Sequence, residues 1–252
     1  MFNYKTVCLD LDGTVYRGIE PIPEAVRFIR RLQEAGIEPF YITNNASMTR
    51  TQLRQKLAGF GVITTEEFIY TSGMAAAQFV KRELPDAKVF VIGTAALREE
   101  LETVGLELVE EGSNAVIMGI DKDITYTKLA TACLEVRAGA KLIATNPDHA
   151  FPSHQGFLPG NGAFVKLVEF STETDAIFCG KPSSIMLELI QQQTGASKED
   201  MVLIGDNMKT DLLAGVNFGI DTIHVNSGVD RPETVQASAM SVSRYIESMD
   251  EL

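Results

Sequence analysis

Near its start the chain reads Thr6-Val7-Cys8-Leu9-Asp10-Leu11-Asp12-Gly13-Thr14. An apolar run of this kind predicts a buried strand, and Gly13 permits a tight turn directly after it. Ligands of open α/β sheets bind outside the carboxyl ends of the strands, so Asp10 and Asp12 are expected in the active crevice. Two close carboxylates repel each other, and that cost is tolerated where they bind a cation or divide the roles of nucleophile and acid/base. Taken alone, the pattern also fits an Asp-rich turn that closes a strand.

Similar apolar runs recur along the chain and alternate with amphipathic segments. This alternation predicts an α/β protein built from βα units around a mainly parallel sheet. The expected strands are 6–11, 38–43, 68–71, 88–92, 115–119, 141–145, 176–179, 201–204 and 223–225. The expected helices include 23–35, 48–59, 73–84, 125–138 and 184–194, and residues 146–163 are expected to form a long loop.

Composition excludes several classes of protein. The 252 residues are enough for one large α/β domain or for a core with an inserted second domain. The net charge of −12 disfavours nucleic acid, whose binding draws on clustered Lys and Arg. The three cysteines lie far apart in apolar runs, which indicates reduced thiols and favours the cytoplasm. We expect no signal peptide and no membrane span, because no apolar run approaches ~18 residues.

Polar side chains follow three further apolar runs, where the predicted strands end. Thr43 and Asn44 offer groups suited to phosphate oxygens, although the same residue types also favour a helix N-cap. Lys181 provides a cation beside the carboxylates, although a lone lysine is normally a solvated surface charge. Asp206 suits Mg²⁺ as a hard oxygen ligand, and Asp211 follows five residues later. Four strand ends that each carry a polar group useful for phosphoryl transfer are far less expected by chance than one such strand end alone.

The chain resembles the haloacid dehalogenase superfamily. The four motifs of that superfamily are similar, in chain order, to Asp10-Leu11-Asp12-Gly13-Thr14, Thr43-Asn44, Lys181, and Gly205-Asp206 with Asp211. The pair of aspartates two residues apart resembles the phosphatase and phosphomutase branches, which argues against hydrolysis of C–halogen bonds. Within the superfamily, the chain resembles the NagD-type subfamily (subfamily IIA), which includes acid-sugar and 4-nitrophenyl phosphatases. The segments that carry this resemblance are Tyr41-Ile42-Thr43-Asn44-Asn45, Thr71-Ser72-Gly73-Met74-Ala75, Ala144-Thr145-Asn146-Pro147-Asp148 and Pro159-Gly160-Asn161-Gly162.

The resemblance implies a domain organisation and a reaction. Residues 1–83 and 177–252 would form a Rossmann-like catalytic core with a parallel sheet, and residues 84–176 an inserted α/β cap of the C2 type. The enzyme would hydrolyse phosphomonoesters of small metabolites, such as sugar or acid-sugar phosphates, through an aspartyl-phosphate.

The resemblance also assigns roles to residues. Asp10 would be the nucleophile and Asp12 the general acid and base. Mg²⁺ would be held by Asp10, the backbone carbonyl of Asp12 and Asp206. The phosphate oxygens would be bound by Thr43, Asn44 and Lys181, and the supporting residues would be Asp211, Gly13 and Asn207.

Substrate choice is expected to depend on the cap. Its loop 145–163 contains Asn146, Asp148 and His149, with Asp148 as the only formal charge and with no Lys or Arg. Such a lining suits a small hydroxylated leaving group, whereas the carboxylate of an acid sugar needs a cation from elsewhere or from a protonated histidine, His149 or His154. The resemblance leaves open a homo-oligomer assembled through the cap.

Two other functions remain open from the sequence. A phosphotransferase or mutase could use the same aspartyl-phosphate and would transfer it to a sugar hydroxyl rather than to water. A phosphate-binding or signalling module without catalytic activity could also place acidic residues beside a phosphorylatable Asp. The complete set of motifs and the large insertion argue against such a module.

Overall fold

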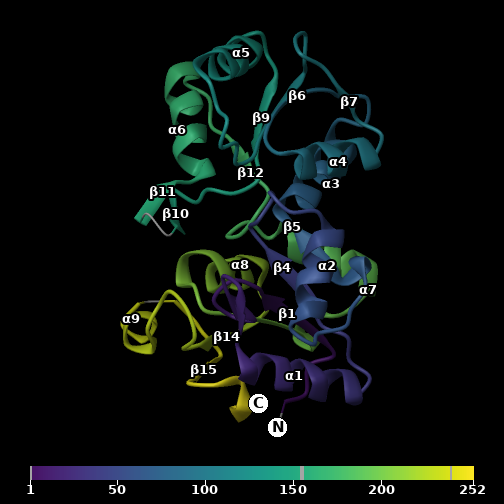
Figure 1. The fold of residues 1–252 in the computed structure, drawn as a ribbon, viewed down its shortest axis with the longest axis vertical. Coiled ribbons are helices and arrows are strands. Elements are labelled where there is room, and N and C mark those ends of the chain that lie inside the picture. The colour runs from purple at the N-terminus through teal and green to yellow at the C-terminus, as the bar shows by residue number, and fades with distance from the viewer. Residues whose placement is uncertain (1, 154–155, 239) are drawn as a thin grey trace. The chain divides into compact units, whose positions relative to one another are not determined.

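The computed structural model describes residues 2–153, 156–238 and 240–252 (Figure 1). The chain divides into two compact units. The first unit consists of Met1–Thr43, Arg50–Tyr70 and Lys181–Leu252, and the second of Asn44–Thr49 and Thr71–Gly180. Each unit has its own central sheet.

The sheet of the first unit has the strand order β15-β14-β13-β1-β4-β5. These strands are β1 (Thr6–Asp10), β4 (Phe40–Thr43), β5 (Ile69–Thr71), β13 (Met201–Gly205), β14 (Asp221–Val225) and β15 (Arg244–Ile246). The central strand β1 pairs in parallel with both β13 and β4. Every residue of β1 and β13 is buried, which explains why these strands are near-continuous apolar runs.

Helices connect the strands of the first unit. They are α1 (Pro23–Glu34), α2 (Arg50–Gly59), α7 (Ile185–Thr194), α8 (Leu213–Phe218) and α9 (Pro232–Gln236), with short helical turns at Glu66–Phe68, Lys198–Asp200, Met208–Leu212 and Met249–Glu251. Helix α1 starts with Pro23, whose fixed φ suits a first helical position, and buries Ala25, Phe28, Ile29 and Leu32 at helical spacing. A small hairpin of β2 (Tyr16–Arg17) and β3 (Glu20–Pro21) follows the turn after β1.

The second unit has a five-stranded sheet with the order β12-β9-β8-β6-β7. The strands are β6 (Lys88–Ile92), β7 (Glu107–Leu108), β8 (Ala115–Met118), β9 (Lys141–Ala144) and β12 (Ile177–Phe178). All four pairings in this sheet are parallel. Its helices are α3 (Ser72–Glu83), α4 (Ala95–Thr103), α5 (Tyr126–Arg137) and α6 (Asn161–Thr172), and residues of α5 and α6 share one apolar core with β6, β8 and β9.

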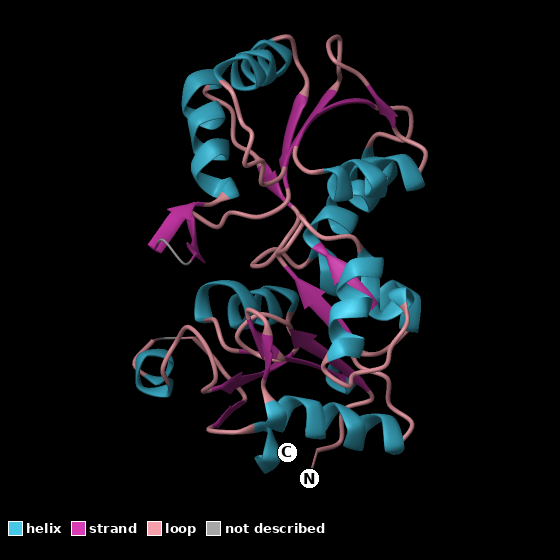
Figure 2. Ribbon diagram, viewed as in Figure 1, coloured by secondary structure: helices cyan, strands magenta, loops and turns pink. Residues whose placement is uncertain are grey.

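The α/β class with parallel sheets is confirmed. The prediction of a continuous loop over 146–163 is wrong in part, because β10 (Ala150–Ser153) and β11 (Gly156–Pro159) pair as antiparallel strands (Figure 2). Helix α6 also begins inside that segment, at Asn161. The Pro and Gly content of the segment concealed both elements, because these residues are typical of loops. His154 lies outside the described residues.

The edge strand β15 was not predicted, since Arg244–Ile246 is too short to show an alternating pattern. The domain boundaries at 84 and 176 stay a prediction. Among the described residues, no helix combines the length and the apolar character that a bilayer crossing requires.

Candidate active site

Asp10 is the last residue of the central strand β1 and is buried. Its Oδ1 accepts a hydrogen bond from the Nζ of Lys181, whose side chain is also buried. Its Oδ2 is buried and accepts no hydrogen bond from any group that the structure describes. A buried carboxylate oxygen without a donor is costly unless another positive group meets it.

Two further carboxylates lie beside Asp10. One ligand atom each from Asp10, Asp206 and Asp211 lies within 4.8 Å of the others. Asp206 directly follows β13, whereas Asp211 lies one turn later, in the π-helical turn Met208–Leu212. The parallel pairing of β1 with β13 therefore brings together carboxylates that are almost 200 residues apart in the chain. The hydrogen bond from Thr14 to Asp206 likewise joins residues 192 positions apart.

Lys181 and Asn207 fix the third carboxylate of this acidic triad (Asp10, Asp206 and Asp211). The Nζ of Lys181 lies 2.8 Å from Oδ1 of Asp211. The backbone N–H of Asn207 donates to Oδ2 of Asp211 over 3.1 Å, and the Asn207 side chain caps the same turn by accepting from the N–H of Lys209. Both carboxylate oxygens of Asp211 are thus engaged by protein groups.

Each carboxylate oxygen of Asp206 accepts one hydrogen bond. The hydroxyl of Thr14 donates to Oδ1 over 3.0 Å, and the backbone N–H of Val229 donates to Oδ2 over 2.6 Å. Two glycines allow the chain to pass close to this carboxylate: a Cβ on Gly13 would lie 2.5 Å from Oδ2 of Asp206, and one on Gly228 would lie 1.9 Å from it. Gly13 also has a φ of +100°, which other residues rarely adopt.

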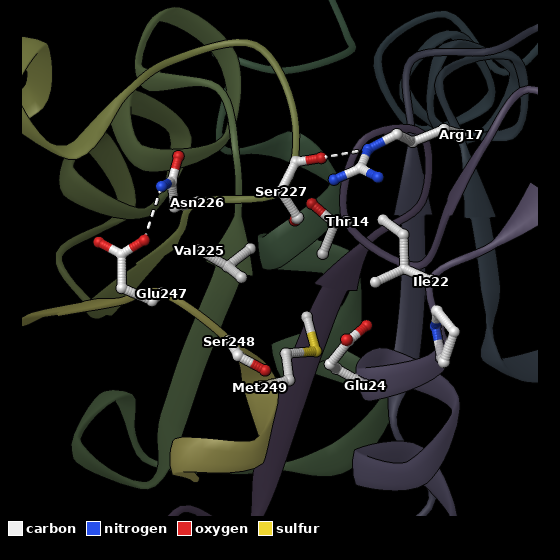
Figure 3. Close-up of a pocket in the computed structure, with 11 residues that line it drawn as sticks. Thr14, Arg17, Ile22, Glu24, Val225, Asn226, Ser227, Glu247, Ser248 and Met249 are labelled. Atoms are coloured by element: carbon white, nitrogen blue, oxygen red, sulfur yellow. Dashed lines mark hydrogen bonds between the residues drawn. The ribbon is translucent and has the colours of Figure 1, made fainter.

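The loop Asn226–Asp230, which we call the strap, follows β14 and ties the two acidic turns together. The Ser227 hydroxyl donates to the carbonyl of Gly13 over 2.7 Å, and the Ser227 carbonyl accepts from Nε of Arg17 over 2.6 Å. On its other side Asn226 donates to Glu247 over 2.7 Å. Figure 3 shows both outer contacts around a pocket of about 260 Å³, lined by Thr14, Arg17, Ile22, Pro23, Glu24, Val225, Asn226, Ser227, Glu247, Ser248 and Met249.

The charges of this cluster do not balance. If all groups ionise, three negative charges face the single positive charge of Lys181. Burial and the carboxylate of Asp211 raise the pKa of Asp206 to about 6 and hold the pKa of Asp10 well above its usual range. Burial alone lowers the pKa of Lys181, but the Asp10 and Asp211 carboxylates outweigh it and keep this pKa above its usual value. The cluster therefore favours an added cation.

Asp12 and Thr43 lie near these groups in the first unit. Asp12 is exposed and forms an isolated backbone bridge with Tyr16, so its carboxylate is not part of the buried triad. Thr43 ends β4 and is buried, and its neighbour Ile42 pairs with Asp10 and accepts from Nζ of Lys181 over 3.4 Å.

The remaining predicted residues belong to the second unit. The amide of Asn44 donates to the carboxylate of Asp148 over 3.4 Å, and the amide of Asn146 donates to the carbonyl of Asn44 over 2.8 Å. Asn161 is buried and its amide lies within hydrogen-bond distance of the carbonyls of Met118 and Asn146. His149 is exposed, and its carbonyl accepts from the N–H of Gly160. Hydrogen bonds therefore connect Asn146 and Asp148 to Asn44, and Asn161 to Asn146.

Comparisons with known proteins agree on one family. A model described as haloacid dehalogenase-like hydrolase matches residues 7–107, and a HAD-hydrolase-like model matches residues 178–252. The chain is 40% identical over 251 residues to the 5'-nucleotidase YutF of Bacillus subtilis (strain 168), which covers 100% of this chain and 98% of the relative. The chain belongs to the haloacid dehalogenase-like hydrolases.

Other relatives of this hydrolase are also phosphatases. An acid sugar phosphatase of Staphylococcus saprophyticus is 37% identical over 253 residues, covering 100% of this chain and 98% of the relative. The structure of a thermostable NPPase double mutant from Geobacillus stearothermophilus has a TM-score of 0.94 at 38% identity, over 100% of this chain and 99% of that one. A p-nitrophenyl phosphatase from Archaeoglobus fulgidus has a TM-score of 0.92 at 30% identity, over 98% and 97%. The chain is a NagD-type phosphatase that acts on phosphorylated small molecules.

Sequence reasoning missed the groups that hold the acidic triad of this haloacid dehalogenase-like hydrolase. Thr14 was part of a recognised motif but received no role, and the strap residues Ser227 and Val229 were not singled out. One signal was available, because Asn226-Ser227-Gly228 is a turn-like segment at the end of another predicted strand. The donors themselves include a backbone N–H, which carries no sequence signature.

Proposed function

We propose that this phosphatase hydrolyses phosphomonoesters of small metabolites with the help of Mg²⁺, through an aspartyl-phosphate on Asp10. One observation carries the proposal: the acidic triad is buried with Lys181 as its cation, which leaves two negative charges uncompensated when all three carboxylates are ionised. Burying an uncompensated charge is costly, and a bound divalent cation would remove that cost, which supports the proposal.

The donor groups fit Mg²⁺. This ion prefers hard oxygen ligands and takes few of them from the protein, and the unpartnered Oδ2 of Asp10 is such a ligand. Asp206 presents a second carboxylate in a fixed orientation, and the backbone carbonyl of Asp12 is the third ligand that we assign. Asp211 is held by Lys181 and Asn207, so we assign it to support rather than to the metal. When bound, the ion would neutralise charge on the phosphate and on the carboxylates.

The protein groups would then perform two displacements. In the first step a carboxylate oxygen of Asp10 forms a bond to phosphorus, and the bond from phosphorus to the leaving oxygen breaks. Asp12 donates a proton to that leaving oxygen. In the second step Asp12 takes a proton from a water molecule whose oxygen bonds to phosphorus, and the bond from phosphorus to Asp10 breaks. We assign the phosphate oxygens to Lys181, Thr43 and Asn44.

We further assign residues 84–176 to a C2-type cap that excludes water, with Asn146, Asp148 and His149 selecting the leaving group. The names of the relatives support small phosphorylated metabolites, because these proteins are a 5'-nucleotidase, acid sugar phosphatases and p-nitrophenyl phosphatases. Three free cysteines, of which Cys8 and Cys179 are buried, support a reducing compartment such as the cytoplasm.

The test is phosphate release from p-nitrophenyl phosphate and from a panel of sugar, acid-sugar, polyol and nucleoside phosphates, with Mg²⁺ or with a chelator. We expect release only with Mg²⁺, and we expect Asp10→Asn to abolish turnover while circular dichroism shows an unchanged fold. Trapping of phosphate on the native protein during turnover, and its absence on Asp10→Asn, checks the covalent step. Full activity of Asp10→Asn would refute the assignment of the nucleophile.

A further inference from the structure

Lys56 is a cation for which the proposed mechanism has no use. It lies in the last turn of α2, and its side chain is partly buried. Its Nζ lies 3.6 Å from the ring centroid of Tyr16, which is a close cation–π contact. Among the described residues, no carboxylate or carbonyl oxygen lies within hydrogen-bond distance of this ammonium group, in contrast to Lys198, whose Nζ donates to the carbonyl of Phe218.

The contact places Lys56 on the turn that carries Asp12. Tyr16 forms a backbone bridge with Asp12, and its carbonyl accepts from the N–H of Gly13 over 2.8 Å. The ring beneath the ammonium is therefore part of the same tight turn as the proposed acid. The electrostatics agree, because burial lowers the pKa of Lys56 and the charge of Asp12 acts in the opposite direction. Asp12 is exposed, so this face of the turn is open to a ligand.

A partly buried ammonium group with free N–H donors suits an anionic acceptor. The cation–π contact holds the group in place, but it replaces only part of the hydration that the ammonium has lost. Carboxylates and phosphates both satisfy the charge and the N–H groups. The phosphate of the substrate is already assigned to Lys181, Thr43 and Asn44, so a carboxylate is the acceptor that remains. Loop 145–163 contains no Lys or Arg, so a carboxylate on the leaving group must find its cation outside that loop.

We propose that Lys56 is a specificity-determining residue that binds a carboxylate on the leaving group, close to the oxygen that Asp12 protonates. The preferred substrates are then phosphorylated sugar acids and hydroxy acids. The inference rests on the proposed function, because it assigns Asp12 to the leaving group. A purely structural lysine would serve the packing of Tyr16 equally well for every substrate.

The experiment compares matched substrates on Lys56→Met, which keeps an unbranched apolar side chain on Tyr16 but removes the charge. The pairs are 3-phosphoglycerate with glycerol 3-phosphate, and glucuronic acid 1-phosphate with glucose 1-phosphate, which differ by a carboxylate in place of a hydroxymethyl group. The matched control is Lys198→Met, because Lys198 also lies on an aromatic ring, 4.2 Å from the centroid of Phe218, but precedes β13 at the end opposite Asp206. Lys56→Arg keeps the charge, and thermal unfolding reports the stability of each variant.

We expect Lys56→Met to raise KM for the carboxylate substrates by about tenfold or more, with kcat little changed and with the neutral partners and p-nitrophenyl phosphate hydrolysed as before. We expect Lys56→Arg to retain most of the preference and Lys198→Met to retain all of it. Equal losses on both members of a pair, or no loss on either, would overturn the inference. So would a native enzyme that hydrolyses p-nitrophenyl phosphate with Mg²⁺ but shows no preference for the carboxylate substrates, a result that leaves the proposed function intact.

Discussion

Protons and Mg²⁺ compete for the acidic triad, so the stabilisation by Mg²⁺ should depend steeply on pH. Burial and the Asp211 carboxylate raise the pKa of Asp206 to about 6, and Asp10 is shifted in the same direction. Above pH 6 the ligand oxygens of Asp206 are ionised and ready for a cation. Below pH 6 a proton must leave first, so the affinity for Mg²⁺ falls about tenfold for each further pH unit through Asp206 alone.

The expected magnitudes follow from linkage. At a Mg²⁺ concentration of about 100 times the dissociation constant at pH 8, binding stabilises the folded protein by about 2.7 kcal/mol. That corresponds to a rise in Tm of roughly 5–10 °C for a chain of this length. At pH 5 and the same concentration, a tenfold weaker affinity leaves about 1.4 kcal/mol, and protonation of Asp10 reduces it further.

In the metal-free protein, the contribution of Asp206 to folding stability should decrease as pH rises. A carboxyl group whose pKa is raised in the folded state stabilises that state at low pH, and this contribution disappears as pH rises through the folded pKa. For Asp206 the move from 3.8 to about 6 corresponds to about 3 kcal/mol, lost between about pH 4 and pH 6.

The assay is thermal unfolding of the native protein and of Asp206→Asn between pH 5 and pH 8, with EDTA or with Mg²⁺. The native protein should gain most from Mg²⁺ at pH 8 and little at pH 5, and the variant should gain little at any pH. The difference between the two proteins isolates Asp206 from other groups that titrate. A shift of equal size at pH 5 and pH 8 would refute the reasoning, since it would mean that no proton competes with the metal.

Three substitutions test the surroundings of the triad and the loop of the second unit. Ser227→Ala removes the donor to the buried carbonyl of Gly13, which should lower the free energy of unfolding by about 1–3 kcal/mol. In a titration of activity against Mg²⁺, the concentration for half-maximal activity should rise about tenfold. Gly228→Ala would place a Cβ 1.9 Å from Oδ2 of Asp206 and displace that carboxylate, so kcat/KM should fall by about 100-fold. Gly59→Ala is the control, because no atom lies within 4 Å of its Cβ, and its kcat/KM should be unchanged. Asn161→Ala leaves the carbonyl of Asn146 without its donor, whereas the carbonyl of Met118 keeps the N–H of Thr145. The variant should lower the free energy of unfolding by about 2 kcal/mol in urea, and an unchanged midpoint would contradict this.

The strands and their polar ends were predictable from the sequence because the signal is local. Strand β1 is a continuous apolar run since it is buried on both faces, and the carboxylate that follows it must lie at the carboxyl edge of the sheet. The same reasoning predicted that Lys181 and Asp206 would lie near Asp10. Where the local signal is weak, as in the Pro- and Gly-rich stretches 150–153 and 156–159, the sequence predicted a loop and the structure has two antiparallel strands.

The sequence by itself determined the α/β class, the order of the long apolar strands along the chain and the residue types available for catalysis. Only the tertiary structure decided which groups meet: that Lys181 bridges Asp10 and Asp211, that Thr14 and Val229 orient Asp206, and that Lys56 lies on Tyr16. The physical reason is that Lys181 and Asp10 are 171 residues apart, and Thr14 and Asp206 are 192 apart. Contacts at such separations depend on how the strands pair and how closely the glycine turns approach, and neither is encoded in the composition of any single segment.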